Sequence, residues 1–333
     1  MKGKHNIIVQ NNKLRYEMEI KRNITIIQGN SATGKTTLID MLRQATNYGE
    51  SSGVNVRCDV PCRILEGKDW KLILQNISGN IIFIDEENAF IKTEEFASAI
   101  KESDNYYVLI TRENLYNLPY SVEEIYGLHS SGKYQNTTKV YQQLYHIYSA
   151  CEDISVRPDK IVTEDSNAGY EFFSDVCADK GMICESAEGK SNLFSVLENE
   201  NDKEICVIAD GAAIGPEMSK LYHLVKHNKN IKLYLPESFE WLILNSGLFD
   251  SREIWNILEH PEDYIESEKY FSWERYFTNL IMNVAKDTYM KYNKNKLNPV
   301  YLHEKNKDVI LKSIEGIVLT QKDAALTFLQ DRN

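Results

Sequence analysis

The sequence predicts an α/β protein with two successive parallel-sheet units and a helical C-terminal region. Two observations lead to this fold class. Short apolar runs alternate with amphipathic segments up to residue 111, and the same alternation starts again at Lys160, which is typical of strands joined by helices in a parallel sheet. Beyond Asp250 the pattern is helical and rich in aromatic residues. We therefore expect domains at residues 1–157 and 158–250, followed by a helical region at 251–333.

In the first domain, residues that alternate between apolar and polar, as in a β-strand, are followed by apolar residues with the spacing of an α-helix. Alternating residues up to Ile20 predict a hairpin that leads into a buried strand at residues 23–29. From Lys35 to Asn47 apolar residues recur every third and fourth position, which predicts a helix that stops at Gly49. Further strands are expected near Val54 and at 81–85 and 106–111, with helices from Asp69, at 93–101 and, a short one, at 140–151.

The second domain repeats the alternation of strand and helix. We expect strands at residues 160–165, 182–186, 204–210 and 231–235. The helices between and after them are expected at 168–180, 191–199, 216–227 and 239–245. The helical region then ends in an amphipathic segment at 308–330.

The composition is that of an ordinary soluble globular protein and excludes several functional classes. The 333 residues carry a formal net charge of −11, so we do not expect nucleic acid to be held by bulk charge, which requires a basic face. No apolar stretch reaches the ~20 residues of a membrane span, and the first residues turn polar too early for a signal peptide. We therefore expect a cytoplasmic protein without membrane contact, whose six cysteines are reduced thiols.

A glycine-rich motif lies between the predicted strand at 23–29 and the helix that follows it. Residues 29–36 read GNSATGKT, which matches G-x-x-x-x-G-K-[ST] in the context that the motif requires. Glycines allow backbone N–H groups to surround phosphate oxygens, while Lys35 reaches the β and γ phosphates and Thr36 coordinates Mg²⁺. With ATP and Mg²⁺ as cofactors, the predicted nucleotide-binding residues are Gly29, Asn30, Ser31, Ala32, Thr33, Gly34, Lys35, Thr36 and Thr37.

This motif resembles the phosphate-binding loop of the P-loop NTPase superfamily, and the second acidic motif of that superfamily is also present. Four apolar residues precede Asp85 and Glu86, as in the Walker B pattern. The resemblance implies that Asp85 holds Mg²⁺ and that Glu86 orients the attacking water. The strand at 106–111 ends with Thr111, Arg112 and Asn114 and resembles the sensor strand of AAA-type ATPases, in which a polar residue contacts the γ phosphate. The alternative is that Arg112 is a surface residue at a strand end.

The second domain resembles the Rossmann-like TOPRIM fold of topoisomerases, primases and overcoming-lysogenization-defect nucleases. Glu164 closes the first predicted strand and Asp210 the third, and Gly189–Asn192 follows the second, as in that fold. The resemblance implies that Glu164 and Asp210 bind Mg²⁺ and are catalytic. Because Ala212 replaces the second acid of the usual Asp-x-Asp pair, the alternative is a degenerate domain without chemistry. In an active site the missing carboxylate would come from Asp165, Glu185 or Glu237.

A lysine-rich segment near the C-terminus is the best candidate for a nucleic-acid contact in this acidic chain. Tyr292 and Tyr301 lie among its lysines, although a solvated loop would have the same composition. The lysines are Lys291, Lys294, Lys296, Lys305 and Lys307.

Together these features predict that the first domain binds and hydrolyses ATP and thereby controls nucleic-acid processing by the second, as in defence or repair nucleases. The rival hypothesis is a nucleotide-dependent switch or assembly subunit whose degenerate second domain binds a partner protein. A small-molecule kinase is disfavoured, because an Asp-Glu pair suits activation of water. Assembly into a homo-oligomer is also considered, since an ATPase without its own arginine finger often takes one from a neighbour.

Overall fold

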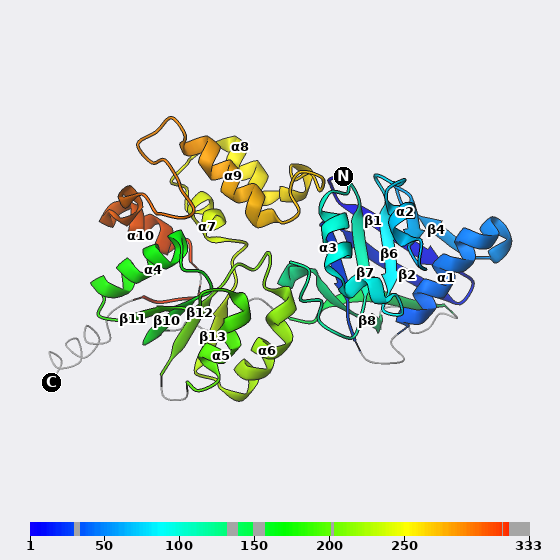
Figure 1. Ribbon diagram of the computed structural model, residues 1–333, viewed down its shortest axis with the longest axis horizontal. Coiled ribbons are helices and arrows are strands. Elements are labelled where there is room, and N and C mark those ends of the chain that lie inside the picture. The colour runs from blue at the N-terminus through cyan, green and yellow to red at the C-terminus, as the bar shows by residue number, and fades with distance from the viewer. Residues whose placement is uncertain (30–33, 132–138, 149–156, 201–202, 315, 320–333) are drawn as a thin grey trace. The chain divides into compact units, whose positions relative to one another are not determined.

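The computed structural model describes residues 1–29, 34–131, 139–148, 157–200, 203–314 and 316–319. Two compact units share the chain: unit 1 consists of Met1–Tyr148 and Glu259–Arg275, and unit 2 of Ser149–Leu258 and Tyr276–Asn333. In Figure 1, most strands of unit 1, among them β1, β6, β7 and β8, and the strands β10 to β13 of unit 2 are labelled. Each unit combines a sheet with helices, so the predicted α/β class is confirmed.

The described part of unit 1 forms a single nine-stranded sheet in the order β4-β1-β2-β9-β8-β3-β7-β6-β5. The strands from β8 to β5 run parallel, whereas β1 is antiparallel to β2 and β4, and β9 is antiparallel to β8. The sheet is therefore mixed, where the sequence indicated a largely parallel one. The strands are β1 (His5–Gln10), β2 (Leu14–Ile20), β3 (Ile24–Ile27), β4 (Asn55–Arg57), β5 (Cys62–Ile64), β6 (Ile81–Asp85), β7 (Tyr106–Ile110), β8 (Ile125–Ser130) and β9 (Val140–His146).

Helix α1 (Lys35–Tyr48) lies at the centre of the unit 1 core and confirms the helix predicted after the glycine-rich motif. Leu38, Met41 and Leu42 share one face of the helix and are buried, as their spacing requires. The helix contacts β1 and β4 near one end of the strand order and β5 and β6 at the other. The sheet therefore curves around α1.

The other face of the parallel strands is covered by α3 (Glu94–Lys101), which also confirms a predicted helix. Thr93 caps this helix, because its side chain accepts a hydrogen bond from Phe96 N–H at 3.2 Å. The Phe96 ring meets Tyr107 of β7 edge to face, with the ring centroids 6.1 Å apart. Tyr106, the preceding residue, belongs to the core around α1 instead, since successive strand residues point to opposite faces. A shorter helix, α2, spans Trp70–Leu74.

Residues 259–275 return to unit 1 after the chain has formed the sheet of unit 2. Asn23 Nδ2 donates to Ser267 O at 3.1 Å, and the Arg22 guanidinium carbon lies 3.5 Å from the centroid of the Trp273 ring. Because Arg22 and Asn23 directly precede β3, the returning segment covers the amino edge of the parallel strands. The opposite, carboxyl edge carries the glycine-rich motif.

The described part of unit 2 contains a four-stranded sheet in the order β11-β10-β12-β13, in which every pairing is parallel. Figure 1 shows α4 on one face of this sheet and α5 and α6 on the other, the arrangement expected from right-handed crossovers in this strand order. The predicted alternation of strands and helices is thus confirmed. The elements are β10 (Lys160–Thr163), α4 (Ala168–Asp179), β11 (Ile183–Ser186), α5 (Leu193–Leu197), β12 (Ile205–Ile208), α6 (Met218–His227), β13 (Ile231–Tyr234) and α7 (Phe239–Asn245).

The chain after Asp250 is helical, as predicted. It contains α8 (Arg252–Glu259), α9 (Trp273–Ala285) and α10 (Glu304–Lys312). The described part of the amphipathic segment predicted at 308–330 begins within α10, while residue 315 and residues 320–330 lie outside the described residues. Within the described ranges, no helix has the length and apolar character needed to cross a membrane.

The helix predicted at 140–151 is wrong. Its first seven residues form β9, which pairs in parallel with β2 and antiparallel with β8. Residues 149–151 lie outside the described residues. The strand is held by partners at Leu14–Glu17 and Tyr126–Ser130, which lie far away in the sequence.

Candidate functional site

The carboxyl edge of the parallel strands in unit 1 gathers both predicted nucleotide motifs. Because β3, β7 and β6 are parallel neighbours, the residues at their ends, Gly29, Asp85 and Thr111, lie along one edge. After α1 and the edge strand β4, the chain re-enters the parallel strands at β5, beyond β7 and β6, whereas after β7 it passes to β8, on the other side of β3. The ends of β3 and β7 therefore form a topological switch point, the place where open α/β sheets bind ligands.

The two ends of the glycine-rich loop frame this switch point, whereas Asn30, Ser31, Ala32 and Thr33 lie outside the described residues. Gly29 has φ 144° and Gly34 has φ 91°, values that favour glycine. Thr36 and Thr37 are exposed on the first turn of α1.

Lys35 is buried at this edge, with only 6% of its surface exposed. Its Nζ donates a hydrogen bond to Gly29 O, which lies at the other end of the loop. Burial lowers the pKa of Lys35, and the carboxylates of Glu86 and Asp85 raise it. The charge of Arg112 lowers the pKa of Lys35 as well. All three charged groups therefore lie close enough to act on one ammonium group.

Asp85 and Glu86 follow each other at the end of β6 but have different surroundings. Asp85 is 9% exposed, and its Oδ1 accepts a hydrogen bond from Glu86 N–H at 2.7 Å. Burial raises the pKa of Asp85, a shift that a bound cation would reverse. Glu86 is more open and pairs with Arg112, whose Nε lies 2.9 Å from Glu86 Oε1. Arg112 is solvent-exposed, yet it belongs to the charge cluster around Lys35.

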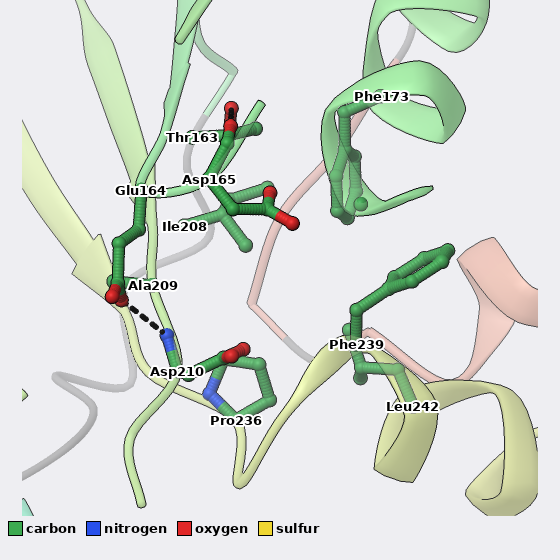
Figure 2. Close-up of a pocket in the computed structure, with 11 residues that line it drawn as sticks. Thr163, Glu164, Asp165, Phe173, Ile208, Ala209, Asp210, Pro236, Phe239 and Leu242 are labelled. Carbon is green, nitrogen blue, oxygen red and sulfur yellow. Dashed lines mark hydrogen bonds between the residues drawn. The ribbon is translucent and has the colours of Figure 1, made fainter. Parts of the chain in front are cut away.

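The two predicted acids of unit 2 meet at the carboxyl edge of its sheet. Glu164 follows β10 and Asp210 follows β12, and these strands are parallel neighbours. Glu164 Oε2 accepts a hydrogen bond from Asp210 N–H at 3.0 Å, as Figure 2 shows. Both acids line a small pocket that is partly open to solvent. Its opposite wall is apolar and includes Phe173, Phe239 and Leu242 (Figure 2).

Asp165 is a third acid of this pocket. Its side chain points toward the aromatic wall, whereas Glu164 points toward Asp210 (Figure 2). Burial raises the pKa of Asp165, while Lys294 lowers it and Glu240 raises it. Glu240 is buried and accepts a hydrogen bond from the Tyr292 hydroxyl at 2.9 Å. No local pattern in the sequence indicates that Tyr292 and Lys294 lie near this acidic site.

The turn Gly189–Asn192 follows β11 at the same edge, in the position that the resemblance implied. Gly189 N–H donates to Glu164 O at 2.7 Å, and Lys190 Nζ donates to Ala213 O at 2.8 Å. Lys190 thereby brings a positive side chain to the loop that follows Asp210.

The predicted replacement for the missing acid is found only in part. Ala212 is buried, and its N–H donates to Glu237 O at 3.3 Å, so the backbone of Glu237 lies beside the loop after Asp210. Glu185 instead pairs with Lys160 at the start of β10, with 2.5 Å between Oε2 and Nζ, and does not supply the carboxylate. Within the residues that the structure describes, no three His, Cys, Asp or Glu side chains are grouped to hold a metal ion.

The lysine-rich segment at 291–307 is part of unit 2, and only some of its lysines are exposed. Lys307 is buried and pairs with Asp175 and Asp179 of α4, so the predicted phosphate contact is wrong for this residue. Tyr292 and Tyr301 are buried too, which removes both rings from base stacking. The exposed lysines of the segment are Lys291, Lys296 and Lys305.

No family model matches the chain, and no curated protein is significantly similar to it.

Proposed function

We propose that unit 1 binds and hydrolyses a nucleoside triphosphate, with ATP as the expected substrate. The observation that carries this proposal is the convergence of Lys35, Asp85, Glu86 and Arg112 at the switch point beside the glycine-rich loop. A buried ammonium between two loop glycines suits phosphate oxygens, because backbone N–H groups and the start of α1 add further positive potential. Such an edge is favourable for a polyphosphate and unfavourable for a neutral ligand.

Each residue then has a distinct part in hydrolysis. Lys35 and the loop amides would bind the β and γ phosphates, and Thr36 and Asp85 would hold Mg²⁺, which neutralises charge on these phosphates. Glu86 would accept a hydrogen bond from the attacking water and direct it in line with the bond to be broken. Arg112 would stabilise the charge that develops on the γ phosphate.

Exchange of Glu86 for glutamine tests this proposal, because it keeps the shape of the side chain and removes its basicity. We expect Glu86→Gln to bind ATP and to hydrolyse it at least about 100-fold more slowly. The matched control is Glu87→Gln, since Glu87 is the exposed neighbour and should retain full turnover. Normal turnover in Glu86→Gln would assign the base to another residue, and a wild-type protein without ATP binding would overturn the proposal.

For unit 2 we propose metal-dependent cleavage of a phosphodiester, controlled by ATP turnover in unit 1. The adjacent carboxylates of Glu164 and Asp210 support this proposal, because Mg²⁺ in phosphate sites is usually held by one or two carboxylates and water. These two residues would hold the ion, which supplies an activated water and charge neutralisation.

The alternative is a switch in which unit 2 binds a partner protein. The buried Ala212 favours it, since the second acid of the expected pair is absent. Cleavage of a nucleic acid by the purified protein distinguishes the two functions.

A further inference from the structure

Tyr16 of the hairpin strand β2 lies against the joint between the glycine-rich loop and α1. Its side chain is fully buried, and its hydroxyl donates to Gly34 O at 2.8 Å. The same carbonyl accepts the first hydrogen bond of α1 from Leu38 N–H at 3.0 Å. A Cβ placed on Gly34 would lie 3.0 Å from the Tyr16 hydroxyl, so the contact is close.

This hydroxyl is suited to be a permanent donor. Burial raises the pKa of Tyr16, and a hydrogen bond with the Thr37 side chain opposes that shift. The phenol therefore keeps its proton at physiological pH and can donate to Gly34 O throughout that range. Its ring is fixed within the core around α1, which limits the positions that the hydroxyl can reach.

The hydrogen bond from Tyr16 also orients the Lys35 N–H, because this N–H and the Gly34 carbonyl lie in one peptide plane. Gly34 C=O and Lys35 N–H belong to the same planar trans peptide and point in opposite directions. Holding the carbonyl toward Tyr16 therefore directs the Lys35 N–H away from Tyr16. Without this bond Gly34 would be less constrained, because glycine has the widest range of backbone conformations.

We propose that Tyr16 is a positioning residue for the nucleotide, which orders the Gly34–Lys35 peptide before phosphate arrives. The inference rests on the proposed nucleotide binding by unit 1 and names a residue that lies outside both nucleotide motifs. Ordering a binding element in advance increases affinity, because less conformational freedom is lost on binding. ATP and ADP both present a β phosphate to such a loop, so the effect should be equal for the two nucleotides.

The test is Tyr16→Phe, which removes only the hydroxyl. We expect the Kd values for Mg·ATP and Mg·ADP to rise about three- to tenfold, as for loss of one neutral hydrogen bond, and KM to rise more than kcat falls. The matched control is Tyr107→Phe. Tyr107 is also buried, and its hydroxyl donates to Ser103 Oγ at 2.6 Å on the face covered by α3. This control should leave both Kd values unchanged.

Isothermal titration calorimetry, at a temperature below the unfolding transition of every variant, gives the outcome. Unchanged Kd values in Tyr16→Phe would overturn the inference and leave the proposed ATPase intact. Equal increases in both variants would also overturn it, since they would show a general loss of stability. A wild-type protein that binds neither nucleotide would overturn the inference together with the proposed function.

Discussion

The carboxyl edges of the two sheets differ in their balance of charge. In unit 1 the cations Lys35 and Arg112 lie beside the acids Asp85 and Glu86. In unit 2 the pocket is lined by three acids, Glu164, Asp165 and Asp210, opposite an apolar wall. A phosphate would therefore meet cations at the first edge, whereas at the second edge the three acids outnumber the nearby Lys190 and Lys294, and a bound metal ion would offset the excess negative charge. Under the proposed functions, the same strand arrangement would serve two kinds of phosphate chemistry, one at an edge where cations and acids are balanced and one at a mainly acidic edge that would require metal.

The strongest test of this difference is cleavage of a nucleic acid in the presence and absence of metal. With Mg²⁺ or Mn²⁺ the protein should cut one of single- or double-stranded DNA or RNA, and Asp210→Ala should reduce the rate at least about 100-fold without loss of ATP hydrolysis. Gel assays with and without ATP measure both effects. Glu185→Gln is the control, because Glu185 pairs with Lys160 at the start of β10 and should leave the rate unchanged.

Persistent cutting by Asp210→Ala would remove this acid from the mechanism. A wild-type protein that hydrolyses ATP but cuts none of these substrates would favour the switch, and a search for its partner protein would follow.

A second, roughly tenfold effect concerns the pH dependence of Mg·ATP binding in unit 1. Burial raises the pKa of Asp85, so this side chain is protonated at mildly acidic pH more readily than an ordinary aspartate. Because Mg²⁺ requires the carboxylate, its contribution to ATP affinity should be complete above the raised pKa of Asp85 and fall about tenfold per pH unit below it. Calorimetric titrations with Mg²⁺ or with EDTA between pH 5 and 8 separate this contribution from protonation of ATP itself.

Asp85→Asn should remove the dependence on pH that is specific to Mg²⁺. An equally steep dependence in that variant would assign the metal to other ligands. In EDTA, ATP should still bind to unit 1, because Lys35 contacts phosphate without metal. Nucleic-acid binding by unit 2 should be lost under the same conditions, because it depends on metal.

The last comparison concerns stability and not activity, and it takes one glycine from each unit. A Cβ on Gly211 of unit 2 would lie 2.5 Å from Leu235 O and 2.9 Å from Pro236 O, both backbone atoms that cannot turn away. A Cβ on Gly127 of unit 1 would meet the Tyr145 ring at 2.4 Å, but this side chain is half exposed and can rotate. We expect Gly211→Ala to lower the free energy of unfolding by about 2 kcal/mol and Gly127→Ala by less than about 1 kcal/mol. Urea unfolding followed by circular dichroism measures both, and equal losses would show that the loop at Leu235 yields as easily as a surface side chain.

Helices and strands whose burial follows from a local pattern of apolar residues were predicted correctly from the sequence. The apolar run before Asp85 is fully buried as β6, and the helical spacing after Gly34 produces α1. The prediction failed for β9, where Val140, Leu144 and Tyr148 have a helix-like spacing. This strand has neither a fully buried nor a fully exposed face, so alternation is absent and its partners in β2 and β8 determine its structure.

In the candidate sites, too, local features were predicted from the sequence and long-range contacts were not. The residues within each motif could be identified because strand ends and loops place them, but contacts between distant segments could not. Tyr292 reaches Glu240 over 52 positions, and Lys307 reaches Asp175 over 132. Such pairs depend on how the C-terminal helices fold back within unit 2, which no local periodicity encodes.

The return of residues 259–275 to unit 1 affects the order in which the protein matures on the ribosome. Asn23 is synthesised early, but its partner Ser267 emerges 244 residues later. At typical rates of synthesis this interval is about 10 to 50 s, and the whole sheet of unit 2 is translated within it. The amino edge of β3 therefore stays uncovered during most of translation. Unit 1 therefore begins first and is completed only after the sheet of unit 2 has been synthesised, whereas the residues at its carboxyl edge, from Gly29 to Arg112, are all translated before that sheet.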